Sequence, residues 1–173
     1  MRDNSISSKA MIMDADVLID LIKADRSVLK LFVKHLGPLY AITPVAEEVK
    51  DVKDLNELSK LGIDIIEPHI DDAFEASIET GPTSFKDRLN MLTAKRHKLI
   101  CVTNDKHLRK LCNKKKVATL RGLELLIELQ KAGGISIERA INIAKRIHRI
   151  NPKYINKKVL EAFIVKIKKK KLF

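Results

Sequence analysis

The stretch from residue 11 to residue 22 reads MIMDADVLIDLI. Its first three residues continue an apolar run of the β type that begins at Ala10, and Asp14 closes that run. After it, apolar residues recur at a helical spacing: Val17, Leu18, Leu21 and Ile22. A strand that leads directly into an amphipathic helix is the first half of a βαβ unit. The sequence therefore predicts a strand, a helix and a carboxylate at their junction.

The same alternation of short β-type runs and longer helical patterns continues along the chain. Predicted strands cover residues 10–13, 39–42, 63–66, 99–102 and 117–120. Predicted helices cover about residues 16–24, 27–36, 43–52, 71–79, 84–96, 105–112, 122–131, 136–150 and 156–170, with a further turn or helix up to Leu61. This alternation indicates an α/β fold with a parallel sheet of about five strands.

Length and composition predict one domain with an appendage. The chain has 173 residues, of which 45% are hydrophobic and 32% charged, a normal balance for a globular protein. The pair Gly133-Gly134 ends the last helix of the α/β body. We therefore place a domain over residues 1–131 and a helical extension with a basic tail over residues 132–173.

The net charge of +12, from 34 Lys and Arg against 22 Asp and Glu, favours an anionic partner such as nucleic acid. The basic residues concentrate in two zones, residues 106–116 and residues 151–173. The candidate nucleic-acid-binding residues in these zones are Lys106, Arg109, Lys110, Lys168, Lys169, Lys170 and Lys171.

The sequence also predicts a cytoplasmic protein. Cys101 and Cys112 lack the spacing of a zinc site or a disulfide framework, which fits a reducing compartment. No apolar leader precedes Ala10, and no apolar stretch approaches the ~18 residues of a membrane span. We therefore expect no membrane contact.

Four acidic residues lie where a predicted strand ends or a predicted helix begins: Asp14, Glu48, Asp87 and Asp105. Connections of a parallel sheet can converge on one crevice, where four carboxylates would repel one another unless a divalent cation compensated them. Mg²⁺ and Mn²⁺ prefer such oxygen ligands. A CxxC motif, a Gly-rich phosphate loop and a Ser nucleophile elbow are all missing from the sequence. The pattern therefore predicts a Mg²⁺ or Mn²⁺ site.

Helix capping is the ordinary alternative for each of these acids. Asp16 lies nearer the first helical apolar pair than Asp14 and is the better candidate for a cap, while Ser84 and Asp87 could form a capping box.

The neighbouring pair Glu47 and Glu48 is separated by helical phase. In a helix over residues 43–52, Glu48 would lie about 60° from the buried Val45 and Glu47 about 200° away. Glu48 is therefore the metal candidate, and Glu47 is expected to be solvated.

Four segments in order resemble the PIN-domain nucleases, which include the VapC-type toxins and related archaeal proteins. They read MIMDADVLIDL, ITPVAEEV, SFKDRLNMLTAKRHKLICVTNDKHL and VATLRGLELLIEL, within about residues 10–131. The resemblance implies an α/β/α sandwich around a parallel sheet and cleavage of RNA that depends on Mg²⁺ or Mn²⁺. It also implies a catalytic metal site at Asp14, Glu48, Asp87 and Asp105, supported by Thr103. Asp16 stands where the family often has Asn or Ser, which leaves a fifth acid or a simple cap open.

The expected function is a metal-dependent endoribonuclease that uses water as the nucleophile. Two alternatives are an RNA-binding or ribosome-assembly module with little activity, and a VapC-type toxin masked by a small antitoxin. An apolar groove exposed on the first helices would favour the toxin. Besides RNA, the expected partners are a second copy of the chain and an antitoxin. For the C-terminal helical pair, three roles stay open: a dimer or partner surface, an arm that holds RNA, and packing with a solvated tail.

Overall fold

The apolar residues Met11–Met13 have no exposed surface and form β1, the central strand of a parallel sheet. The computed structural model describes residues 9–169. The five strands of the sheet are β1 (Met11–Met13), β2 (Leu39–Ile42), β3 (Ile63–Ile66), β4 (Ile100–Val102) and β5 (Thr119–Leu120). They run parallel in the order β3-β2-β1-β4-β5. The prediction of an α/β fold with a five-stranded parallel sheet is confirmed.

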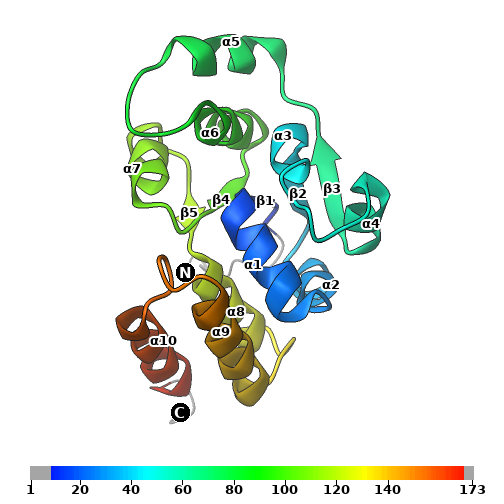
Figure 1. The fold of residues 1–173 in the computed structure, drawn as a ribbon, viewed down its shortest axis with the longest axis vertical. Coiled ribbons are helices and arrows are strands. Elements are labelled where there is room, and N and C mark those ends of the chain that lie inside the picture. Colours follow the sequence, from blue (N-terminus) through cyan, green and yellow to red (C-terminus); the bar gives the residue numbers. More distant parts are fainter. Residues whose placement is uncertain (1–8, 170–173) are drawn as a thin grey trace, which may run out of the picture.

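Helices cover both faces of this sheet (Figure 1). Their bounds are α1 (Ala15–Asp25), α2 (Val28–His35), α3 (Thr43–Ala46), α4 (Leu55–Lys60), α5 (Ile70–Ile78), α6 (Phe85–His97), α7 (Lys106–Lys114), α8 (Gly122–Lys131), α9 (Ile137–Ile150) and α10 (Lys157–Lys169). Helices α1, α2, α8 and α9 pack together on one side, and α5, α6 and α7 on the other. The result is a three-layer α/β/α sandwich in which α9 belongs to one helical layer and α10 packs on α9.

The strand order places a topological switch point beside β1. The chain first moves from β1 outward to β2 and β3, and then returns to add β4 on the other side of β1. Met13 of β1 lies opposite Val102 of β4, so the two strands end side by side. In parallel sheets of this kind, ligands bind in the crevice at the carboxyl ends of the strands where the order reverses. Asp14 and Thr103 directly follow these two ends.

The helix predicted over residues 43–52 is wrong in length. Helix α3 ends at Ala46, and the next backbone hydrogen bonds, from Glu48 N to Val45 O at 3.1 Å and from Val49 N to Ala46 O at 3.2 Å, are tight turns. A new helix, α4, begins after Asp54, whose carboxylate accepts from Glu57 N at 2.9 Å. Val49 is buried although it lies outside the helix. The apolar spacing therefore predicted burial correctly and conformation incorrectly.

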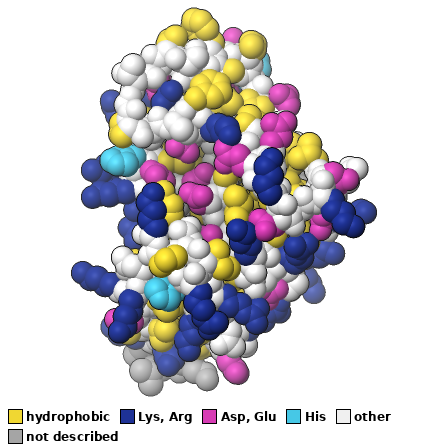
Figure 2. All heavy atoms as spheres, viewed as in Figure 1, with side chains coloured by type: hydrophobic (Ala, Val, Ile, Leu, Met, Phe, Trp, Pro, Cys, Tyr) yellow, Lys and Arg dark blue, Asp and Glu magenta, His cyan; other side chains and the backbone are white. Residues whose placement is uncertain are grey.

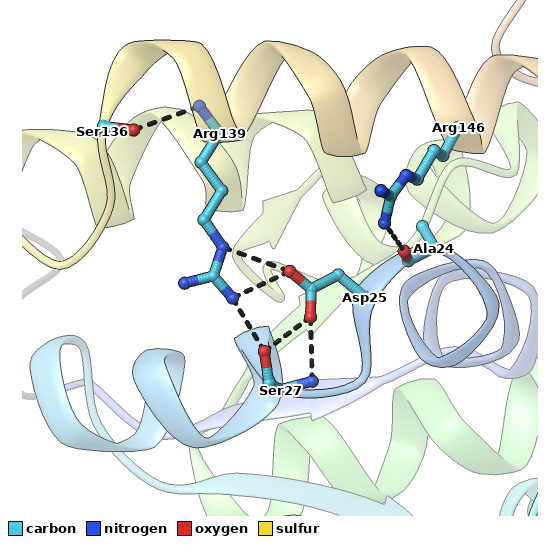
Figure 3. Close-up of polar contacts among 6 residues, drawn as sticks. All are labelled: Ala24, Asp25, Ser27, Ser136, Arg139 and Arg146. Carbon is cyan, nitrogen blue, oxygen red and sulfur yellow. Dashed lines mark hydrogen bonds and ion pairs between the residues drawn. The ribbon is translucent and has the colours of Figure 1, made fainter.

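Helix α9 is held against the first helices by polar contacts (Figure 3). The Arg139 guanidinium donates to Asp25 Oδ2 at 2.8 and 3.2 Å and to Ser27 Oγ at 2.7 Å. Nη1 of Arg146 donates to the Ala24 carbonyl at 2.9 Å. Burial raises the pKa of Asp25, but the hydrogen bonds from Ser27 and Arg139 outweigh it and hold the pKa below its ordinary value. For α9, packing is therefore the role that the structure favours among those left open.

No helix in the described part of the chain is both long enough and apolar enough to cross a lipid bilayer.

Candidate functional site

Asp14 lies at the centre of the site because β1 ends beside β4. Its backbone N–H donates to Val102 O at 2.9 Å, which continues the pairing of the two strands. Its side chain caps α1, with Oδ1 accepting from Ala15 N at 2.8 Å. The prediction that Asp16 caps this helix is wrong. Asp14 still has the extended backbone of a strand end, whereas Asp16 already lies in the first turn of the helix.

Burial makes Asp14 an unusual carboxyl group. Only 7% of the residue is exposed. Burial raises the pKa of Asp14 to about 7, the Thr103 hydrogen bond opposes this rise, and the charges of Asp87 and Asp16 add to it. Such a shift is typical of functional carboxylates, and also of structural ones that lack a counter-charge.

Thr103 connects Asp14 to Asp105. The Thr103 hydroxyl, which is fully buried, donates to Asp14 Oδ2 at 2.7 Å and accepts from Asp105 N at 3.1 Å. Asp105 Oδ1 in turn caps α7 by accepting from Leu108 N at 2.8 Å. One hydroxyl therefore fixes the orientation of the first carboxylate and the backbone of the second.

Asp87 approaches from the other layer. It forms the capping box considered above, since Ser84 Oγ accepts from Asp87 N at 3.1 Å and Asp87 Oδ2 accepts from Ser84 N at 3.0 Å. Its charge nevertheless acts on the site, because it raises the pKa of both Asp14 and Asp16. The capping role and the proximity to the site exist together.

Glu48 reaches the site from the turn after α3. Helical phase does not place Glu48, because α3 has already ended at Ala46. The turn nevertheless leaves Glu47 exposed and Glu48 half-buried, in an ion pair with Lys86 of α6. The charge of Glu48 raises the pKa of Asp16, so the two side chains face the same region.

These contacts define the acidic cluster: Asp14, Asp16, Glu48, Asp87 and Asp105. Burial raises the pKa of Asp16, and the charges of Glu48, Asp87 and Asp105 raise it further, which relates all these acids to one region. Figure 2 shows acidic side chains across the middle of this face with Lys and Arg side chains around them. Electrostatic repulsion of this kind is relieved by a bound cation or by protonation.

The acidic cluster also meets the loop between α9 and α10, which the sequence analysis did not identify. Tyr154 OH lies 3.5 Å from Asp105 Oδ2, and the Lys153 charge lowers the pKa of Asp16. On the same side, Asn151 Nδ2 donates to the buried Asp20 at 3.1 Å. Burial raises the pKa of Asp20 to about 6, and the Asn151 hydrogen bond opposes the rise. In the sequence, Asp20 stands among the apolar residues of α1. A charged residue at a buried position of this kind is the one sequence signal that could have indicated a polar partner from another part of the chain.

The donor set suits a hard divalent cation, because it offers carboxylates and a hydroxyl and no thiolate or imidazole. Among residues 9–169, however, no three His, Cys, Asp or Glu side chains are arranged so that they could hold one metal ion. A cation at Asp14 would therefore require further carboxylates of the acidic cluster to turn toward it. Lys86, which neutralises Glu48, is one group that would have to release its partner.

The candidate nucleic-acid-binding residues that the structure describes fall into two groups, one on α7 and one at the end of α10. Lys106 and Lys110 are exposed on α7, whereas Arg109 is half-buried and donates to Asn104 O at 2.6 Å. Lys168 and Lys169 are exposed at the end of α10. Lys170 and Lys171 lie outside the described residues.

The fold is similar to that of a PilT N-terminus domain protein, that is, a PIN-domain protein, from the hyperthermophilic archaeon Sulfolobus solfataricus P2. The two structures superpose with a TM-score of 0.51 at 11% sequence identity, over 71% of this chain and 92% of the other. No protein-family model and no curated protein match the sequence. The fold of this chain is therefore PIN-like, while the residues that act in it must be argued from its own site.

Proposed function

We propose that the protein is an endoribonuclease that hydrolyses RNA phosphodiester bonds with the help of a divalent cation, Mg²⁺ or Mn²⁺. The observation that carries the proposal is the buried Asp14 carboxyl at the switch point of a PIN-like sheet, with its pKa raised to about 7 among further acids. The excess of positive charge on the chain suits a polyanionic substrate.

Asp14, Glu48, Asp87 and Asp105 are the residues that would hold the cation. When bound, such a cation supplies an activated water and offsets the charge on the leaving oxygen. Thr103 keeps one oxygen of Asp14 engaged and leaves that carboxylate in a fixed orientation. Asp105 is fixed through its backbone by the same hydroxyl. Lys153 and Tyr154 border the acidic cluster, where an ammonium and a phenol can contact the phosphate and sugar of a bound strand.

The test is cleavage of a labelled single-stranded RNA after removal of metal with EDTA and readdition of Mn²⁺ or Mg²⁺. The variant Asp14→Asn should lose at least about a hundredfold in rate, since changes to mere neighbours of metal ligands already cost ~10–100-fold. Asp64→Asn is the matched control, because Asp64 is an exposed aspartate on β3. Equal rates for the two variants would show that the cleavage does not come from this site.

An RNA-binding module with little activity is the second candidate. Two observations favour it. Glu48 is paired with Lys86, and among residues 9–169 no three carboxylates are arranged to hold one metal ion. This candidate predicts RNA binding that is indifferent to EDTA and no metal-dependent cleavage by the wild-type protein.

A toxin masked by an antitoxin receives less support from the structure. The feature that would favour it, an apolar groove on the first helices, is not seen: no large hydrophobic side chain of α1 or α2, both within the described residues, is exposed. Helices α8 and α9 cover that side of the molecule.

A further inference from the structure

A cavity of about 280 Å³ opens between α8, α10 and the start of α7. Its wall is contributed in large part by α10 and the loop before it, including Tyr154, Ile155 and Phe163. The volume lies just below the roughly 300–1,000 Å³ of typical small-molecule pockets, so it suits one small unit and not a long segment.

The cavity carries positive charge at its rim. Arg109, Arg121 and Lys166 line it, against the single carboxylate of Glu124. That carboxylate is engaged, since Glu124 Oε2 accepts from Arg121 N at 2.8 Å. Burial lowers the pKa of Arg109, and the neighbouring charge of Arg121 lowers it further, so the two guanidinium groups are close enough to repel each other. A phosphate between them would relieve this repulsion and could accept hydrogen bonds from both.

The rest of the cavity is apolar. Leu123, Ile127 and Phe163 are buried residues that form an apolar side of the cavity, and the half-buried Tyr154 adds an aromatic ring. Aromatic and apolar surfaces of this kind accept nucleobases of any sequence by stacking. An apolar side with a cationic rim matches the two parts of a nucleotide.

The cavity begins where the acidic cluster ends. Tyr154 belongs to both, because its ring lines the cavity and its hydroxyl lies 3.5 Å from Asp105 Oδ2. Asn104, which directly precedes Asp105, lines the cavity as well and accepts from Gly122 N at 3.0 Å. A strand whose phosphate lies at the acidic cluster could therefore place a neighbouring nucleotide in the cavity.

We propose that this cavity binds one nucleotide, with its phosphate at Arg109 and Arg121 and its base against Tyr154 and the apolar side. The inference rests on the proposed function for its source, a nucleotide of the RNA strand next to the cleaved bond. A free nucleoside monophosphate offers the same chemistry. Because α10 and the loop before it line this cavity, they take part in recognising the substrate.

The probes are 5′-AMP, adenosine, inorganic phosphate and a short single-stranded RNA, all in EDTA so that no cleavage occurs. Chemical-shift titration by NMR measures the first three, and fluorescence anisotropy measures the RNA. We expect 5′-AMP to bind more tightly than adenosine or phosphate. Loss of a charged hydrogen bond in Arg121→Gln should weaken 5′-AMP and RNA binding about tenfold.

Ala162→Trp fills the cavity from an exposed position on α10 and should abolish 5′-AMP binding without unfolding the protein. The exposed Arg149, which does not line the cavity, provides the control Arg149→Gln. Thermal melts of all variants establish that they are folded.

The outcomes separate the sources and the two proposals. If Ala162→Trp weakens RNA binding, the cavity is assigned to the RNA strand, whether or not the wild-type protein binds free 5′-AMP measurably. If Ala162→Trp weakens 5′-AMP binding and leaves RNA binding unchanged, the cavity is assigned to a free nucleotide. If Ala162→Trp and Arg121→Gln change neither, the cavity is not a nucleotide site, whatever the result for Asp14→Asn. If they weaken binding while the wild-type protein shows no metal-dependent cleavage, the nucleotide site stands and the endonuclease proposal fails.

Discussion

Replacement of Asp14 by Asn should stabilise the metal-free protein, and more so at higher pH. Asn keeps the size of the side chain and caps a helix as well as Asp does, so the contact with Ala15 N can persist. What it removes is a carboxylate that is costly to ionise in its buried position. The expected gain in the free energy of unfolding follows from the raised pKa of Asp14.

The pKa of Asp14 rises from its ordinary 3.8 to about 7 on folding. The folded state therefore holds a proton that the unfolded state has released between pH 4 and pH 7, and stability falls as the pH rises through this window. About three pKa units amount to about 4 kcal/mol, which the wild-type protein has lost by pH 8. The variant avoids this loss and gives up the acceptor of the Thr103 hydroxyl, worth about 1 kcal/mol. Its net advantage should be about 3 kcal/mol at pH 8.

At pH 5 the advantage should nearly vanish. The pH then lies only about one unit above the ordinary pKa of Asp14 in the unfolded state. The wild-type loss is therefore between about 1 and 2 kcal/mol, and the missing Thr103 hydrogen bond in the variant offsets most of it. Urea denaturation followed by circular dichroism in EDTA, at pH 5 and pH 8, gives both values, with Asp64→Asn as the control. A gain of equal size at the two pH values, or no gain at pH 8, would refute the claim that ionisation of Asp14 is what costs stability.

Three further outcomes are expected. Glu48→Gln should lower the single-turnover rate of metal-dependent cleavage, whereas Glu47→Gln should leave that rate unchanged. If Glu47 proves essential instead, the assignment of Glu48 as the metal-binding residue is wrong. Arg139→Gln should cost about 1–2 kcal/mol of unfolding free energy at pH 7. Because folding lowers the pKa of Asp25, this contribution is present above the ordinary value of 3.8 and is lost as the pH falls through the folded value, so the urea midpoints of the two proteins should converge as the pH is lowered below 3.8. The affinity for single-stranded RNA can be measured at several salt concentrations in an Asp14→Asn background, which prevents cleavage. Lys110→Gln should reduce the slope of log affinity against log salt concentration by about 0.7, whereas the control Lys60→Gln on α4 should leave the slope unchanged.

The fold could be predicted from local patterns because the central strands β1 and β4 are apolar runs that the sheet buries on both faces. Ile100–Val102 is an example, since its three residues are buried and the polar segment 103–105 follows them directly. The helical pattern around Val45 and Val49 misled because a turn buries the same side chains that a helix would. Spacing reports which side chains are buried more directly than it reports the backbone that buries them.

The site could be predicted only in part, for a similar reason. Placement of acids at the ends of strands and the starts of helices led to Asp14 and Asp105, whose positions depend on the central strands. The prediction that Asp16 caps α1 was wrong because it counted residues back from the first apolar pair and ignored where the extended backbone ends, which is at Asp14. Lys153 and Tyr154 have no local signal, since only the packing of α9 on α1 brings their loop to the acidic cluster.

The position of that loop also bears on synthesis of the protein. Asn151 contacts Asp20 across 131 residues, and Tyr154 contacts Asp105 across 49. Contacts this distant in sequence form late in folding, and on the ribosome they cannot form before the last helices have been made. The sheet and the acids that follow its strands can assemble from the first three-quarters of the chain. The surroundings of those acids, and the cavity beside them, are completed only after α9, the loop that follows it and α10 have been made.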